Sequence, residues 1–230
     1  MNYARIDHSN DLIHFTKDKN RWDYLESYNT FFKIVSEGFL KESSYLRLGN
    51  IPSICFTEAS YMALTKDGKL NDKYFSRYSP FGFMFTKVYI FGMGGRPVIY
   101  SPDYEFERDN DKTNWRTVSY YPAGSKGGLY RDFTWEREWR IKPSKGTLKV
   151  DWGEVVLVFP SLAWAEKFRN DLHSKYDQEF NKSVPKDCKI LDYNPELSNE
   201  ENEELKKDAE LMPDFSWTLL NMNCNNIPEP

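Results

Sequence analysis

Cysteine is scarce in this sequence, and its few copies form no recognisable pattern. Cys55, Cys188 and Cys224 show neither CxxC spacing nor the Cys/His spacing of a metal site. Their odd number argues against a disulfide framework, so a reducing compartment is the simplest interpretation. We therefore expect a cytoplasmic protein that needs no metal.

Long apolar runs and familiar enzyme motifs are also missing. No stretch approaches the roughly 18 apolar residues of a membrane helix, and the polar start MNYARIDHSN has no signal-peptide pattern. The chain contains neither a GxSxG motif nor an HExxH motif. These absences argue against a membrane partner, a Ser-His-Asp hydrolase and a zinc protease.

Charge is unevenly distributed along the 230 residues. The whole chain has a net charge of −4, whereas the stretch 196–210 holds seven acids and two lysines, so the remainder sums to +1. This balance gives no broad attraction to nucleic acid, although a local basic groove stays compatible with it. We expect one α+β domain over residues 1–195, followed by an acidic helix and a polar tail over 196–230.

The hydrophobic pattern predicts strands and helices in an order typical of α+β proteins. The expected strands are 11–16, 53–57, 81–91, 96–100, 133–142, 154–160 and 189–193. The expected helices run from about residue 28 to a left-handed Gly38, over 162–180 and over 198–210. We expect a mainly antiparallel sheet with C-terminal helices and a loosely held tail after Pro213.

Three of these segments carry more specific expectations. Glycines between 81–91 and 96–100 predict that these segments form a β-hairpin. The segment 154–160 is the most apolar and is expected to be a central strand.

The segment Trp135–Ile141 holds the most informative pattern. In a strand, Glu136, Glu138 and Arg140 would share one face, with the two carboxylates roughly 7 Å apart. Such a pair in a cleft can divide acid and base tasks, with Arg140 keeping one carboxylate ionised. The alternative is a cross-strand salt-bridge ladder on an exposed face.

Four further side chains have both a structural and a functional interpretation. His14 is either a structural histidine or a pocket residue. Thr57 either hydrogen-bonds within a pocket or is an ordinary β-branched strand residue. Tyr78 and Phe81 belong either to the core or to a stacking wall, and the glycine-rich segment 124–128 lacks phosphate-loop spacing, so it predicts a surface loop.

These short segments follow one another in an order that resembles the AbiGi-type abortive phage-infection proteins of bacteria. The segments are His14–Thr16, Cys55–Glu58, Tyr78–Phe85, Arg96–Tyr100 and Glu138–Ile141. The resemblance covers about residues 12–160. It implies a role in anti-phage defence, where such proteins are usually regarded as the antitoxin-like side of a toxin–antitoxin pair.

More distantly, the layout resembles the ADP-ribosyltransferase fold, including the DarT-type enzymes that modify DNA. The resemblance implies a split, mainly antiparallel sheet and NAD as a substrate. Glu138 would work on the nicotinamide ribose, where a carboxylate stabilises developing positive charge, and Glu136 would activate the acceptor. Arg96 and Arg47 are the candidates for holding the NAD phosphates. The implied NAD-binding residues are His14, Thr16, Thr57, Tyr78, Phe81 and Arg96.

Three functions follow as alternatives. The first is an ADP-ribosyltransferase or NAD glycohydrolase with a protein or nucleic acid acceptor, which requires Glu138 and His14 to face one cleft. The second is a non-catalytic antitoxin on the same fold that binds a toxin or a phage protein, which a Glu138 paired with Arg140 and closed to ligand would favour. The third is a nucleotide-binding sensor. The acidic segment 198–210 either suits a basic partner or is a solvated helix.

Overall fold

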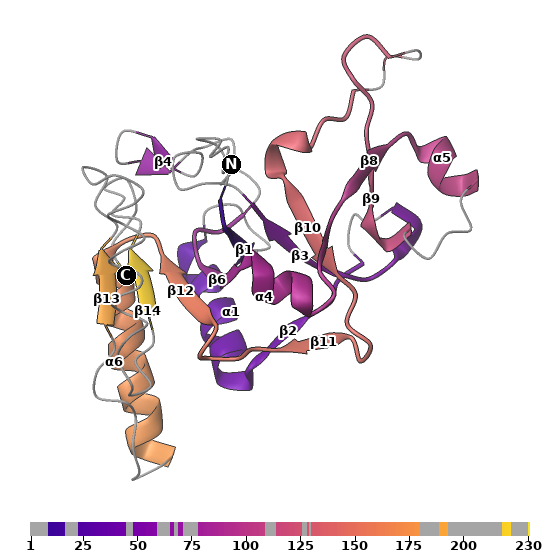
Figure 1. Cartoon of the computed structure of the whole chain (residues 1–230). Coiled ribbons are helices and arrows are strands. Elements are labelled where there is room, and N and C mark those ends of the chain that lie inside the picture. Colours follow the sequence, from indigo (N-terminus) through magenta and orange to yellow (C-terminus); the bar gives the residue numbers. More distant parts are fainter. Residues whose placement is uncertain are drawn as a thin grey trace, which may run out of the picture. The chain divides into compact units, whose positions relative to one another are not determined.

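The computed structural model divides the chain into two compact units that each combine three stretches of sequence (Figure 1). Unit 1 comprises residues 1–14, 38–60 and 85–150, and unit 2 comprises residues 15–37, 61–84 and 151–230. The structure describes residues 9–16, 23–44, 48–58, 65–66, 69–70, 78–108, 114–125, 128, 130–179, 189–192, 218–221 and 230.

The architecture is α+β, as the sequence predicts. The predicted domain boundary at residue 195 stays a prediction, because it lies outside the described residues. The predicted acidic helix over 198–210, Arg47, Cys188 and Cys224 also lie outside them.

Unit 1 is built mainly on antiparallel strands, and only the pair of β8 with β9 among its described strand pairs is parallel. Its strands neighbour one another in the order β6-β1-β3-β10-β7, and β3 and β10 pair in the register Glu138↔Thr57 and Arg140↔Cys55. Two small sheets pair β2 with β11 and β8 with β9. The strands are β1 (Asp11–Phe15), β2 (Phe39–Lys41), β3 (Ile54–Thr57), β6 (Gly82–Thr86), β7 (Arg96–Pro97), β8 (Ile99–Ser101), β9 (Thr117–Ser119), β10 (Glu138–Ile141) and β11 (Thr147–Lys149).

Short helices connect the strands of unit 1. They are the α-helices α4 (Lys87–Gly92) and α5 (Asp103–Arg108) and the 3-10 helices η1 (Leu48–Asn50), η2 (Asn114–Arg116) and η3 (Thr134–Glu136). Strands β1 and β6 begin in one unit and end in the other, because the chain passes between the units within them.

Unit 2 packs two helices around an aromatic core. Phe31 of α1 contacts the rings of Phe83, Phe159 and Phe168, at centroid distances of 4.8, 5.1 and 5.6 Å. The burial of such rings dominates core energetics. The elements of unit 2 are α1 (Tyr24–Glu37), β4 (Thr65–Lys66), β5 (Lys69–Leu70), the start of β6, β12 (Val155–Phe159), α6 (Leu162–Glu179), β13 (Lys189–Asp192) and β14 (Thr218–Asn221).

Several predicted elements are confirmed. Strands β1, β3, β12 and β13 and helices α1 and α6 lie where the hydrophobic pattern places them. Gly38 ends α1 with a φ of 71°, the left-handed conformation that glycine adopts without steric cost. Strand β12 has the neighbours β14 and β6 and is therefore central, as predicted.

The predicted hairpin of 81–91 with 96–100 is wrong. Strand β6 stops at Thr86, whose hydroxyl accepts a hydrogen bond from the Tyr89 N–H at 3.2 Å and caps α4. The β-prone residues that follow are therefore helical, and β7 pairs with β10 instead. The Thr86 cap at the start of α4 therefore outweighs the strand propensity of the residues that follow it.

The expectation of a loosely held tail after Pro213 also needs correction. Residues Thr218–Asn221 form β14, which pairs in parallel with β12 on one side and β13 on the other. A parallel partner so far away in sequence leaves no local signal. None of the helices in the described parts of the chain combines the length and the apolar character that a bilayer-spanning segment requires.

A polar contact joins the two long helices of unit 2. The buried Tyr28 of α1 donates its hydroxyl to Asp171 of α6 at 2.6 Å, and Lys167 donates to the same carboxylate oxygen at 2.8 Å. Burial alone would raise the pKa of Asp171, but the hydrogen bonds from Lys167 and Tyr28 outweigh it and lower the pKa.

Replacing Tyr28 with phenylalanine should lower the free energy of unfolding by about 1 kcal/mol near neutral pH, because the ring stays packed while the hydroxyl donor is lost. A lowered carboxylate pKa stabilises the fold above the unfolded-state pKa, and this stabilisation disappears as pH falls through the folded-state pKa. Urea unfolding of Tyr28→Phe and wild type at about pH 7 and about pH 2.5 should therefore show a larger difference at the higher pH. An equal difference at both values would contradict the assignment to Asp171.

Candidate functional site around Glu138 and Arg140

The predicted continuous strand over 133–142 is wrong at its first half. Residues Thr134–Glu136 form the 3-10 helix η3, and Arg137 adopts left-handed φ and ψ values of 45° and 51°. Strand β10 begins only at Glu138. Glu136 and Glu138 therefore do not share a strand face, and the predicted alternation of the two carboxylates fails because the backbone turns between them.

Glu138 is held on both carboxylate oxygens. Arg140 donates from Nε to Oε1 at 2.9 Å and from Nη2 to Oε2 at 3.1 Å. The thiol of Cys55, on the neighbouring strand β3, also donates to Oε1. The Arg140 and Glu138 side chains are only 5% and 10% exposed, so this bidentate pair is a buried ion pair rather than an exposed salt-bridge ladder.

Arg140 has further partners in the segment that covers it. Its Nη1 donates to the carbonyl oxygens of Trp115 at 3.1 Å and Thr117 at 2.9 Å. Burial alone would lower the pKa of Arg140, but the charge of Glu138 and the contact with Cys55 outweigh it and raise the pKa. The guanidinium is thus fixed in its charged form and joins β10 to η2 and β9.

Glu136 lies beside the same cluster. Its side chain is buried, and its carbonyl oxygen accepts a hydrogen bond from the hydroxyl of Thr57 at 2.6 Å. Burial, above all, together with the charges of Glu138 and Glu136 raises the pKa of Tyr100 well above its usual range, although Arg140 and a backbone hydrogen bond at Glu138 oppose the shift. The hydrogen bond from the Thr57 hydroxyl to the Glu136 carbonyl oxygen holds the turn that precedes β10, which is a structural role.

His14 lies on the other face of the sheet. Residues directly opposite in antiparallel strands share a face, and neighbours along a strand alternate. Thr57 is opposite both Ile13 and Glu138, so Ile13, Thr57 and Glu138 share one face. His14 therefore points the opposite way, where its ring contacts Phe56 at 5.8 Å and its Nδ1 lies 2.7 Å from the Cys55 carbonyl oxygen.

Arg96 is engaged at the end of α4. Its Nη1 donates to the carbonyl oxygens of Phe91 at 2.9 Å and Gly95 at 2.6 Å, and its guanidinium carbon lies 3.9 Å from the centre of the Phe91 ring. The end of a helix presents carbonyl groups that such a donor satisfies. These contacts match a helix-capping arginine better than one that holds the phosphates of NAD.

The remaining predicted residues belong to unit 2. Thr16 is buried and donates its hydroxyl to the Phe81 carbonyl at 3.1 Å. Phe81 is fully buried and contacts Trp164 at 5.2 Å, which supports the core alternative. Tyr78 contacts Phe15 at 6.4 Å. Unit 1 therefore brings together Glu138, Glu136 and Thr57, whereas Thr16, Tyr78 and Phe81 belong to unit 2.

The His14 face carries a second cluster, which no motif in the sequence indicates. Glu58 accepts a hydrogen bond from the Trp139 indole N–H at 2.8 Å and forms an ion pair with Lys87 at 3.0 Å. Lys87 also lies 5.9 Å from the centre of the Trp139 ring. The antiparallel register places Trp139 opposite Phe56 and so brings Trp139 onto this face. The order of residues along the sequence does not give that register.

Among the described residues, no group of three or more His, Cys, Asp or Glu side chains could hold a metal ion. Acceptor and donor groups around Glu138 instead satisfy one another. The arrangement can hold a charge in the interior and fix three backbone segments, which is the chemistry of a structural centre.

Replacing Arg140 with methionine should lower the free energy of unfolding by about 3–5 kcal/mol, because Glu138 would keep a buried charge without its partner. The double variant Glu138→Leu, Arg140→Met should recover at least half of this loss. Urea unfolding of both variants and of Glu138→Leu alone measures the coupling. A loss below about 0.5 kcal/mol for Arg140→Met, typical of surface substitutions, would contradict a structural ion pair.

Known proteins offer no guide to this centre. No family model matches the chain, and neither a curated protein nor a solved structure is significantly similar to it. The resemblance to AbiGi-type proteins and to the ADP-ribosyltransferase fold therefore stays a prediction, and the function has to be argued from the geometry.

Proposed function

We propose that this chain is a non-catalytic, antitoxin-like protein of bacterial anti-phage defence that acts by binding a protein partner. The observation that carries the proposal is the state of Glu138: Arg140 engages both of its carboxylate oxygens, and the Cys55 thiol engages one of them. A carboxylate that stabilises charge on a ribose must be able to contact that ribose. Here the same oxygens stabilise the fold.

The placement of His14 supports the same proposal. An NAD-cleaving site on this scaffold needs Glu138 and His14 in one cleft, and the strand register puts them on opposite faces. Arg96 donates to carbonyl oxygens at the end of α4 instead of pointing an unengaged fork at a ligand. Each of these residues has a structural task that competes with the implied role.

Helix α4 supplies a surface suited to a protein partner. Val88, Phe91 and Met93 are 82%, 52% and 47% exposed and lie within six residues of one another. We call these three residues the α4 apolar surface. Val88 and Phe91 are three residues apart and so share a helix face, and adjoining exposed apolar side chains mark candidate interaction sites. Arg96 lies over the Phe91 ring, which limits the motion of that ring before binding.

Nicotinamide release from NAD tests the first half of the proposal. Wild type and Glu138→Gln should both release no more nicotinamide than a buffer blank, with or without a lysate of phage-infected cells. Neither should bind NAD in calorimetry. Release that wild type shows and a folded Glu138→Gln variant lacks would establish an NAD-cleaving enzyme and overturn the proposal.

Neutralisation of a toxic partner tests the second half. When the chain is co-expressed with a toxin whose growth arrest it relieves, Val88→Asp should reduce rescue of growth tenfold or more, because it places a charge in the α4 apolar surface. The matched control Tyr130→Asp, at another exposed apolar position of unit 1, should keep the rescue. Equal rescue by Val88→Asp and wild type would rule out this surface.

A further inference from the structure

The small sheet of β2 and β11 presents one face inward and one face outward. The register pairs Lys41 with Thr147 and Phe39 with Lys149, and Leu40 with Leu148 between them. Leu40 and Leu148 are buried, whereas Phe39, Lys41 and Lys149 are exposed. Alternation along the strands therefore puts the two lysines and the phenylalanine on the outward face. Figure 1 shows β2 and β11 as neighbouring arrows.

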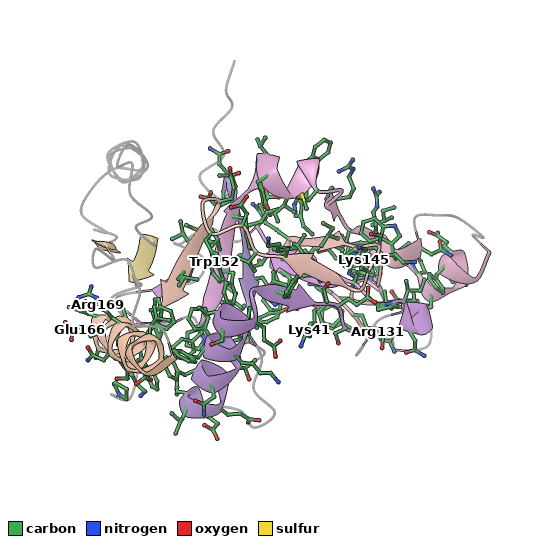
Figure 2. The ribbon with its side chains drawn as sticks, turned by 90° about the horizontal axis from the view of Figure 1, so that it is seen from below. Lys41, Arg131, Lys145, Trp152, Glu166 and Arg169 are labelled. Atoms are coloured by element: carbon green, nitrogen blue, oxygen red, sulfur yellow. The ribbon has the colours of Figure 1, made fainter. Side chains whose placement is uncertain are left out.

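Positive charge is concentrated at this sheet. Two more exposed lysines, Lys142 and Lys145, lie on the short connection from β10 to β11. Figure 2 labels Lys41 on β2 and Lys145 in that connection. We call Phe39, Lys41, Lys142, Lys145 and Lys149 the lysine ribbon. The acid nearest in sequence, Glu42, follows Lys41 and so faces the side of Leu40, where its carboxylate lies beside Gly146.

The spacing of these groups suits a polyanionic chain. Diagonal neighbours on paired strands, such as Lys41 and Lys149, lie roughly 7 Å apart at their Cα atoms. Flexible lysine side chains can adjust from that distance to successive phosphates. Because the whole protein carries a net charge of −4, such attraction has to come from this local cluster and not from the molecule as a whole.

Phe39 distinguishes among polyanions. Its ring is 40% exposed at the first position of β2, directly opposite Lys149. An exposed aromatic ring beside lysines offers a face on which an unpaired base can stack, and bases in a duplex are not available for such stacking. A sulfated sugar or a duplex would use the lysines alone.

We propose that the lysine ribbon binds single-stranded nucleic acid, with the lysines on the phosphates and Phe39 stacked on a base. This site is separate from the α4 apolar surface and does not depend on the function proposed above. It gives the protein a second contact through which it can sense or reach nucleic acid.

Fluorescence anisotropy with a labelled oligo-dT of about 20 nucleotides tests the proposal. Four phosphate contacts predict a slope of about −2.8 in a plot of log affinity against log salt, and so about a fiftyfold loss between about 50 and 200 mM salt. The double variant Lys41→Gln, Lys149→Gln should reduce the slope to about −1.4 and weaken binding about tenfold or more.

Matched variants separate the parts of the site. Lys33→Gln removes an exposed lysine of α1, 70% exposed and 3.8 Å from Glu37, and should leave affinity unchanged. Phe39→Leu keeps an apolar side chain without a stacking face and should weaken single-strand binding about fivefold while leaving heparin binding unchanged.

Three results would overturn the proposal. The first is no binding of the oligonucleotide by the folded wild type at about 50 mM salt. The second is an equal loss for Lys33→Gln and the ribbon variant. The third is equal affinity for duplex and single strand with no effect of Phe39→Leu, which would identify a general polyanion surface.

Discussion

Unit 1 depends on one buried cation. A guanidinium removed from water is costly unless hydrogen bonds and an opposite charge replace its hydration. Arg140 meets that requirement with a carboxylate on its own strand and with carbonyl oxygens of η2 and β9. The Arg140 side chain thereby links β10 to residues 115–117, and its partner Glu138 in turn accepts a hydrogen bond from the Cys55 thiol of β3.

The same constraint shapes the functional interpretation. Residues that match a catalytic order along the sequence can still serve the interior, because linear order does not fix which face of a sheet a side chain occupies. A shift of one residue in a strand moves the side chain to the opposite face. His14 shows this effect: it follows Ile13 directly, yet it joins the Phe56 and Trp139 face while Glu138 lies on the other. The sheet itself separates the two groups that an NAD site would unite.

Local signals predicted the parts of the fold that depend on local physics. Amphipathic helices α1 and α6 and the apolar strand β12 are visible in the sequence because their periodicity reflects burial. Helix α4 was missed because Val88, Tyr89 and Ile90 favour strands, while a single threonine cap decides the conformation.

The candidate site was predictable only in part, for a related reason. The closeness of Glu138 and Arg140 follows from their separation of two residues along a strand. The left-handed Arg137 and the approach of Cys55 from β3 depend on long-range pairing, which no segment of sequence contains by itself.

The interleaving of the two units has a consequence for how the protein can be taken apart. The chain changes unit after residues 14, 37, 60, 84 and 150, so no single cut in the gene yields a fragment that contains one whole unit and nothing of the other. Contacts within each unit join residues that are far apart in sequence, which slows folding because long loops must close first. Nascent chains on the ribosome can therefore complete unit 1 only after residue 150 has emerged, and a co-translational chaperone would meet unpaired strands until then.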